Sequence, residues 1–200
     1  MLIFIDPGHG GEDPGRYGHQ YLYEDDVNWS VAVAVSALLN DRGLETRFTR
    51  EQGQTSSAGA RARFANRYEG DSVFVSIHCN GHWDGVPKGF EVWHFPGSLN
   101  GERLARRLLE SMEESIPRPS RGLKPQSDED RHQAKKLSVL AGTKMPAALV
   151  EMEFLSNKDG LSFLDHGPNQ VKLAAAIASG IEKWVQEVLS CKLRKSSGRS

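Results

Sequence analysis

The chain has 200 residues, of which 38% are hydrophobic, and its formal net charge is −1 at pH 7. This length suffices for one well-buried core but is short for two, so we expect one folded domain over residues 1–189 and a basic, disordered tail over residues 190–200. The near-neutral charge excludes a global attraction to nucleic acid, and no stretch is apolar over the length that a membrane helix needs.

The first residues, MLIFI, lack the charged start, the long apolar region and the cleavage site of a signal peptide. We therefore expect synthesis in the cytoplasm without a leader, so that any action outside the cell follows release by lysis or breakage. Cys79 and Cys191 are too few for a disulfide framework, and we expect both to be free thiols.

Short apolar runs bounded by turn residues predict strands that are buried on both faces. They lie at residues 2–5, 45–49, 72–78, 89–95, 136–140 and 147–152. Between them, apolar residues recur at helical spacing in stripes that begin at Val27, Leu104 and Ile177, and Ser57 is placed to cap a further helix that carries Phe64. Residues 117–133 are rich in charge and proline and read as an exposed loop. This alternation predicts an α/β fold with one twisted, mostly parallel sheet of about six strands and helices on both faces.

Three of the predicted strands lead into side chains that can bind a metal or transfer a proton. His9 follows the first strand, His78 closes the third, and Glu151 stands near the end of the last. Because ligands of open α/β sheets bind outside the carboxyl ends of the strands, we expect these three side chains to converge there. Glu24 begins the helix that follows the glycine-rich turn, and its carboxylate can reach the same edge.

This combination of side chains suits metal-assisted hydrolysis. Two imidazoles and a carboxylate suit a catalytic zinc, which takes three protein ligands and leaves a fourth position open. A further carboxylate beside the metal is the usual general base. Asp6 and Glu12 are the candidates to hydrogen-bond a ligand imidazole from behind.

Each of these residues also has a structural interpretation. A histidine at a strand end is more often a satisfied polar residue than a ligand, and Glu24 alone is a carboxylate favoured by the helix dipole. Glu151 differs, because a carboxylate that ends an apolar strand rarely sits there without a paired charge or a chemical role. A phosphate site in the turn after the first strand is disfavoured, since neither GxxxxGKS nor GxGxxG occurs there.

Several short motifs occur in a fixed order from Leu2 to about Leu189. They are IFIDPGHGGEDPG, YEDDVNWSVA, RARFAN, VFVSIHCN, GFEVWHF, RGLK, LSVL and PAALVEMEFLSN. In content and order they resemble the motifs of the zinc-dependent N-acetylmuramoyl-L-alanine amidases of the amidase_3 family. The resemblance covers nearly the whole chain, and it is specific because several separate motifs agree.

The resemblance implies that His9, Glu24 and His78 bind Zn²⁺ and that Glu151 is the catalytic glutamate. It also implies that residues 1–189 form an amidase catalytic domain whose substrate is peptidoglycan. The bond cleaved would be the amide between the lactyl group of N-acetylmuramic acid and the L-alanine of the stem peptide. The expected absence of a leader fits a phage endolysin that acts on the cell wall after release.

Further residues are implied to support this site. Asn80 occupies the position of the family's SIHxN asparagine, and Arg61 belongs to its RxxxAN element, where a structural role is the simpler expectation. Glu153 stands where the family often has glycine. By strand alternation we expect it on the same face as Glu151, lining the cleft or perturbing the pKa of the base. Trp83, like Trp93, is a candidate to stack on sugar or peptide, or else a packing residue.

Two other functions stay open from the residues. A zinc peptidase that cuts within the stem peptide would use the same chemistry, and a non-catalytic module that only binds the wall would keep the same fold. The tail, with Lys192, Arg194, Lys195 and Arg199, is a candidate for electrostatic contact with anionic envelope polymers.

Overall fold

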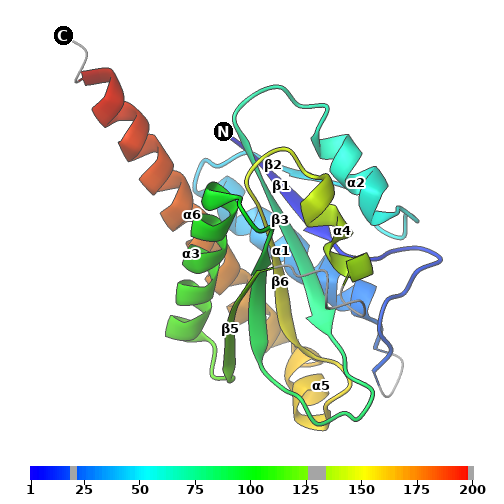
Figure 1. Ribbon diagram of the computed structural model, residues 1–200. Coiled ribbons are helices and arrows are strands. Elements are labelled where there is room, and N and C mark those ends of the chain that lie inside the picture. The colour runs from blue at the N-terminus through cyan, green and yellow to red at the C-terminus, as the bar shows by residue number, and fades with distance from the viewer. Residues whose placement is uncertain (19–21, 126–133, 198–200) are drawn as a thin grey trace.

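A six-stranded sheet forms the centre of the molecule in the computed structural model, which describes residues 1–18, 22–125 and 134–197 (Figure 1). The strand order is β2-β1-β3-β6-β4-β5. Neighbouring strands run parallel except for β4, which is antiparallel to β6, so the predicted mostly parallel sheet is confirmed. The strands are β1 (Leu2–Pro7), β2 (Thr46–Phe48), β3 (Ser72–Asn80), β4 (Phe90–His94), β5 (Ser120–Pro125) and β6 (Ala147–Phe154).

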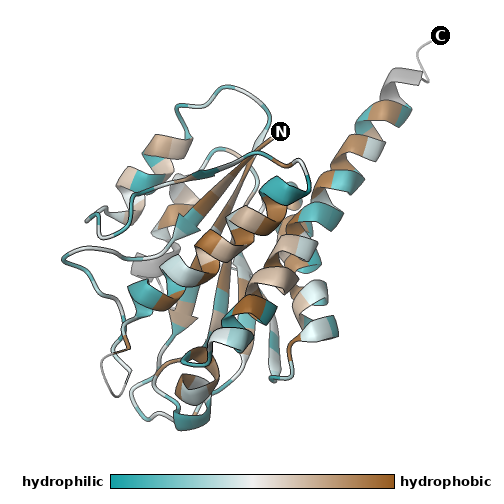
Figure 2. Cartoon of the chain, turned by 180° about the vertical axis from the view of Figure 1, so that it is seen from behind, coloured by the Kyte–Doolittle hydropathy of each residue, from teal (hydrophilic) through white to brown (hydrophobic). Residues whose placement is uncertain are grey.

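Helices lie on both faces of the sheet, as predicted. On one face the larger apolar core joins the strands to α1 (Glu24–Asp41), α3 (Leu99–Ser115) and α6 (Gly167–Ser197). On the other face the shorter α2 (Ala58–Ala65) and α4 (Ala134–Gly142) pack on a smaller apolar cluster. Helix α5 (Lys158–Leu164) follows β6, and its Phe163 and Leu164 belong to the larger core. Figure 2 shows the long helices from behind, and α6 extends well past the sheet. Ser57 caps α2 as expected, since its hydroxyl accepts a hydrogen bond from the Ala60 amide.

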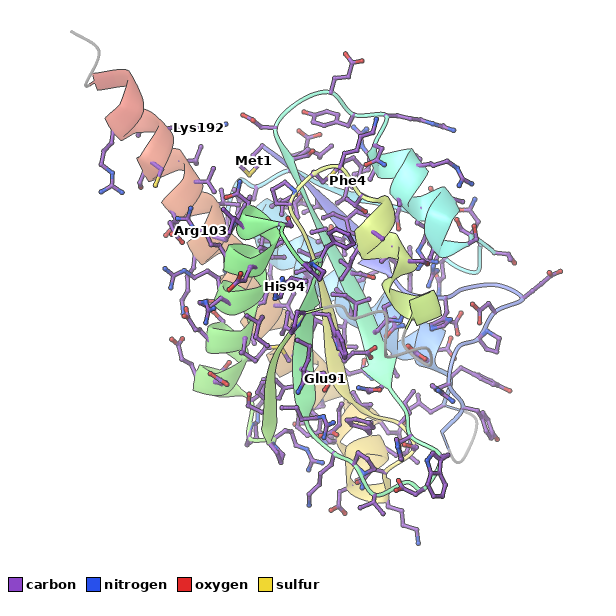
Figure 3. The ribbon with its side chains drawn as sticks, viewed as in Figure 1. Met1, Phe4, Glu91, His94, Arg103 and Lys192 are labelled. Atoms are coloured by element: carbon purple, nitrogen blue, oxygen red, sulfur yellow. The ribbon has the colours of Figure 1, made fainter. Side chains whose placement is uncertain are left out.

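The face under α2 and α4 is covered over only part of its length. Side chains alternate along a strand, so Asp6 shares this face with Phe4, and Glu151 shares it with Leu149. The apolar member of each pair belongs to the cluster under the two helices, whereas the polar member lies further toward the carboxyl end of its strand. Figure 3 shows Phe4 near α2 and Glu91 further along the sheet toward α5. The end of this face that α2 and α4 do not cover is therefore polar. Its side chains, Asp6 and Glu151 among them, are nevertheless buried.

Two expectations for the region after α3 are wrong. The apolar run 136–140 belongs to helix α4 and not to a strand, because alanine and lysine before it favour a helix, and Val139 and Leu140 then pack beside α2. The sixth strand is instead β5, inside the predicted loop 117–133, of which residues 126–133 lie outside the described part. β5 is an edge strand with three exposed and three half-buried residues, which explains its polar, proline-containing sequence.

The predicted disordered tail is also wrong as far as the structure describes it, because α6 continues as a helix to Ser197. Leucine, lysine and arginine in this segment favour a helix, and Lys192 Nζ lies 2.5 Å from Asp71 Oδ2. Within the described ranges, none of the helices is both long and apolar enough to cross a membrane.

Candidate metal centre and active site

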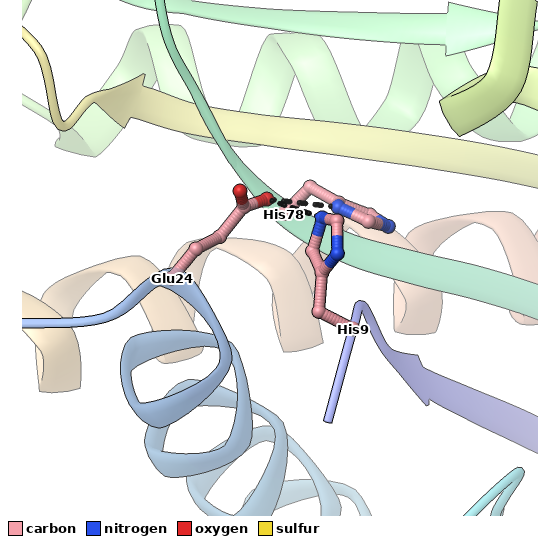
Figure 4. Close-up of side chains that lie close together, drawn as sticks. All are labelled: His9, Glu24 and His78. Atoms are coloured by element: carbon pink, nitrogen blue, oxygen red, sulfur yellow. Dashed lines mark hydrogen bonds and ion pairs between the residues drawn. The ribbon is translucent and has the colours of Figure 1, made fainter. Parts of the chain in front are cut away.

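Three side chains from separate elements meet at the polar end of the sheet. His9 lies two residues beyond β1, Glu24 is the first residue of α1, and His78 belongs to the last part of β3. One ligand atom from each lies within 4.8 Å of the other two (Figure 4). The structure therefore brings together the three residues that the sequence placed at one sheet edge.

The backbone around His9 is shaped to deliver its imidazole to this point. His9 has φ 61°, and among the described residues it alone has a positive φ without being glycine. Such a conformation costs on the order of 1 kcal/mol or more and persists where the surroundings require it. Gly8 is required for another reason, since a Cβ there would lie 2.1 Å from Cε1 of His78. The glycine-rich turn thus lets two imidazoles approach each other closely.

The carboxylate of Glu24 lies between the two imidazoles. Its Oε1 is 3.0 Å from Nδ1 of His78 and 3.3 Å from Nε2 of His9. The Cys79 amide also donates to Oε1, and the Arg16 amide donates to Oε2 at 2.8 Å. Glu24 is fully buried at the N-terminus of α1, where the helix dipole favours a negative charge.

His9 carries the clearest electrostatic signature of the site. Burial by itself lowers the pKa of this imidazole, but the nearby carboxylate of Glu24 and the hydrogen-bonded carboxylate of Asp13 outweigh it, so the pKa of His9 is raised. Nδ1 of His9 lies 2.9 Å from Oδ2 of Asp13. Asp13 is therefore the carboxylate behind the imidazole, rather than Asp6 or Glu12, and such partners fix the ring and its tautomer in metal sites.

The donor set fits a divalent metal. Nε2 of His9 is buried and makes no hydrogen bond within the described residues, although it lies 3.3 Å from Oε1 of Glu24. A cation between the imidazoles and the carboxylate would give this nitrogen a partner and would match the charge of Glu24. Two nitrogen ligands and one carboxylate are a combination typical of catalytic zinc.

Glu151 lies directly beside this cluster. Its backbone pairs with His78 across β3 and β6, so the two side chains occupy neighbouring positions on the same face of the sheet. Glu151 is fully buried. Its other neighbour across the sheet is Glu91 of β4, so His78, Glu151 and Glu91 form one row over three strands.

Glu91 was not among the residues expected from the sequence. It is buried, and its Oε1 accepts hydrogen bonds from Nδ2 of Asn80 at 2.7 Å and from Nε1 of Trp93 at 3.2 Å. A carboxylate inside the apolar run GFEVWHF was the available signal, since the same reasoning selected Glu151. Asn80 and Trp93 are therefore hydrogen-bond donors to Glu91. With only 5% of its surface exposed, Trp93 is a packing residue.

Arg61 and Trp83 lie in different surroundings. Nε of Arg61 is 2.7 Å from Oδ1 of Asp6, and both side chains are buried beside the cluster. Arg61 also lines a hollow of about 430 Å³ that reaches His9 and His78. Trp83, by contrast, is 89% exposed in the loop after β3, with its ring beside that of His82.

The alternation argument for Glu153 is wrong. The register between β3 and β6 shifts after His78 and Glu151, so that Asn80 pairs with Phe154 and β6 holds one extra residue. Alternation therefore does not carry from Glu151 to Glu153. The Glu153 carboxylate instead accepts hydrogen bonds from the Gly89 and Phe154 amides and pairs with Nε of Arg118 at 2.6 Å.

Known proteins resemble this chain over most of its length. N-acetylmuramoyl-L-alanine amidase LytC of Bacillus subtilis is 31% identical over 180 residues, which are 89% of this chain and 34% of LytC, so this chain spans about a third of that relative. The endolysin of Bacillus phage SPP1 is 30% identical over 203 residues, covering 100% of this chain and 69% of the endolysin. The solved structure of N-acetylmuramoyl-L-alanine amidase AmiC2 of Nostoc punctiforme superposes with a TM-score of 0.83 at 30% identity, covering 93% of this chain and 97% of that one. Residues 3–183 match the family described as N-acetylmuramoyl-L-alanine amidase, Amidase_3. The chain therefore belongs to this family of amidases.

Proposed function

We propose that this chain hydrolyses the amide between the lactyl group of N-acetylmuramic acid and L-alanine in peptidoglycan, with a zinc ion held by His9, Glu24 and His78. The observation that supports this most is the row in which Glu151 stands next to His78, whose imidazole lies within 4.8 Å of donors from His9 and Glu24. A bound zinc supplies a Lewis acid that polarises the substrate carbonyl and stabilises negative charge on its oxygen.

Glu151 is the residue that we assign to proton transfer. It accepts a proton from the attacking water and returns it to the nitrogen of the leaving L-alanine, so that the amine departs neutral. Its burial keeps the carboxylate away from bulk water, and its place beside His78 holds it next to the carbonyl. Asp13 orients the His9 ring, and the Arg16 and Cys79 amides orient Glu24.

Metal content and turnover test this assignment separately. The protein is dialysed against a chelator and then reloaded with zinc, and bound metal, melting temperature and wall hydrolysis are measured. We expect one zinc per chain, a higher melting temperature on reloading, and neither in His78→Ala. Zinc uptake unchanged in His78→Ala would contradict the proposed ligands.

Glu151→Gln tests the proton transfer. We expect it to retain zinc and to lose hydrolysis by a factor of about 100 or more, because the amide cannot accept the proton. Glu45→Gln, at an exposed position, is the matched control and should keep full activity. Mass spectrometry of digested wall should find a free lactyl carboxylate and a new L-alanine amine, whereas cleavage within the stem peptide would show a peptidase instead.

We further propose that the end of α6 contacts anionic polymers of the envelope. Lys192 lies on the part of this helix that projects past the sheet (Figure 3), and Arg194 follows two residues later in the same helix. Removal of residues 191–200 should weaken binding to isolated walls at low salt and leave it unchanged at high salt. Equal binding by both proteins at low salt would eliminate this contact.

A further inference from the structure

We propose that Arg121 forms a carboxylate-binding subsite for the peptide that follows L-alanine in the substrate. The inference rests on the proposed amidase function and adds a determinant of substrate choice. The subsite is a second hollow of about 320 Å³ next to the row formed by His78, Glu151 and Glu91. Its lining includes Asn80, Glu91, Trp93, Arg121 and Phe154.

The Arg121 guanidinium is held in place from two sides. Its Nε lies 2.9 Å from Oε2 of Glu91, and its Cζ lies 5.0 Å from the centre of the Phe154 ring. Glu91 is itself held by the hydrogen bonds from Asn80 and Trp93. Because Glu91 and Phe154 are buried and hold the guanidinium in one orientation, Arg121 loses little additional side-chain entropy when it binds a ligand.

Two irregularities in the sheet create this arrangement. Phe90 pairs with Ser120, but Val92 pairs with Leu123, so β5 contains one extra residue at Arg121 and Gly122. Gly122 has φ 82°, a conformation that favours glycine. The extra residue in β6 likewise brings Phe154 opposite Asn80. Bulges commonly redirect side chains beside active sites, and here they bring Arg121 over Phe154.

The side of the guanidinium that faces away from Glu91 is available to a ligand. Only its Nε is hydrogen-bonded within the described residues, so both terminal nitrogens have donors to spare, and 37% of the side chain is exposed. Lys124 lines the same hollow and adds positive charge. Since the charge of Glu91 is matched by Arg121 and its oxygens accept bonds from Asn80 and Trp93, the hollow suits an anion, and a guanidinium binds a carboxylate in a two-bond geometry.

The row of residues determines which part of the substrate enters this hollow. His78 lies on one side of Glu151 and Glu91 lies on the other. Glu151 serves the leaving amine, so the peptide extends past Glu151 toward Glu91 and Arg121. An N-acetylmuramoyl group is neutral once its lactyl carboxyl forms the amide, so a carboxylate near the scissile bond belongs to the peptide.

The test uses two N-acetylmuramoyl-L-alanyl peptides that differ only in whether the residue after L-alanine carries a free carboxylate or a carboxamide. We expect the wild type to cleave the carboxylate form with a kcat/KM about 10-fold higher, mainly through a lower KM. Arg121→Gln should bring this ratio close to one, because it removes the preference for the carboxylate form. Arg106→Gln, an exposed arginine of α3, is the matched control and should keep the wild-type ratio.

The ratio of the two rates is the decisive measure, because partial unfolding of Arg121→Gln lowers both rates equally. A wild type that cleaves both peptides at equal kcat/KM, or a variant that keeps the 10-fold preference, would overturn the subsite. Failure of the wild type to cleave either peptide would instead contradict the proposed function.

Discussion

Replacing Arg61 with methionine should destabilise the protein strongly while leaving its zinc ligands in place. Nε of Arg61 is 2.7 Å from Oδ1 of Asp6, with 4% of the arginine side chain and none of the aspartate side chain exposed. Asp6 also accepts hydrogen bonds from the hydroxyls of Thr49 at 2.5 Å and Ser76 at 2.6 Å. Methionine fills the space of the arginine stem but leaves the buried carboxylate with two neutral partners.

The structure allows the size of this effect to be stated. Removing one partner of a buried ion pair costs about 3–5 kcal/mol, because the remaining charge loses its compensation. For a chain of this length each kcal/mol lowers the melting temperature by about 2–4 °C, so the expected decrease is roughly 6–20 °C. Arg61 also donates to the Ser56 carbonyl, and losing this bond acts in the same direction.

Urea unfolding of four proteins measures the effect. Arg63→Met, at an exposed position on the same helix, should change the free energy of unfolding by less than about 0.5 kcal/mol. The double variant Asp6→Asn with Arg61→Met should recover much of the lost stability, because it leaves no charge without a partner. A loss below about 1 kcal/mol in Arg61→Met, or a double variant no more stable than the single one, would refute the reasoning.

Three further predictions follow from single contacts. Gly8→Ala should lower zinc uptake and the melting temperature, because its Cβ would lie 2.1 Å from the His78 ring, whereas Gly167→Ala, where a Cβ meets nothing within 4 Å, should change neither. Asp13→Ala should weaken zinc binding about 10-fold or more in a competition titration with a chelator, while exposed Asp26→Ala should not; equal affinities would show that the His9 ring needs no partner. Glu153→Gln should lower the free energy of unfolding by about 2 kcal/mol or more through its ion pair with Arg118 but keep zinc binding, and a loss of zinc would place this residue in the site after all.

The proximity of His9, Glu24 and His78 could be predicted because it depends on features that sequence shows well. Each residue stands at the end of a strongly apolar strand or at the start of an amphipathic helix, and parallel strands deliver their carboxyl ends to one edge. Neither Glu91 nor Asp13 follows from these features: Glu91 could be singled out only as a carboxylate within an apolar run, and Asp13 carried no such signal. The role of Glu91 depends on β4 pairing with β6 in the antiparallel direction, and that of Asp13 depends on the path of the loop that carries it.

The helices and strands were likewise predictable where the hydrophobic periodicity of a segment and its length indicate the same element. The run 136–140 is too short for periodicity to separate a strand from a helix, and its neighbours decided in favour of α4. β5 was missed for a different reason, since a half-exposed edge strand carries no clear apolar pattern. Hydrophobic patterns in a sequence indicate which residues are buried. They therefore do not reveal helices or strands at the edge of the core.

The two extra residues in β5 and β6 explain why the substrate side of the site was the least predictable part. A regular β6 would have placed Glu153 on the same face as Glu151. With the extra residue, Phe154 takes the position opposite Asn80, and Glu153 pairs with Arg118. The extra residue in β5 falls at Arg121, which contacts that same Phe154. The positions of His78 and the other proposed metal ligands thus follow from regular strands. The proposed peptide-binding end of the row, by contrast, depends on two register shifts that bring Arg121 and Phe154 together.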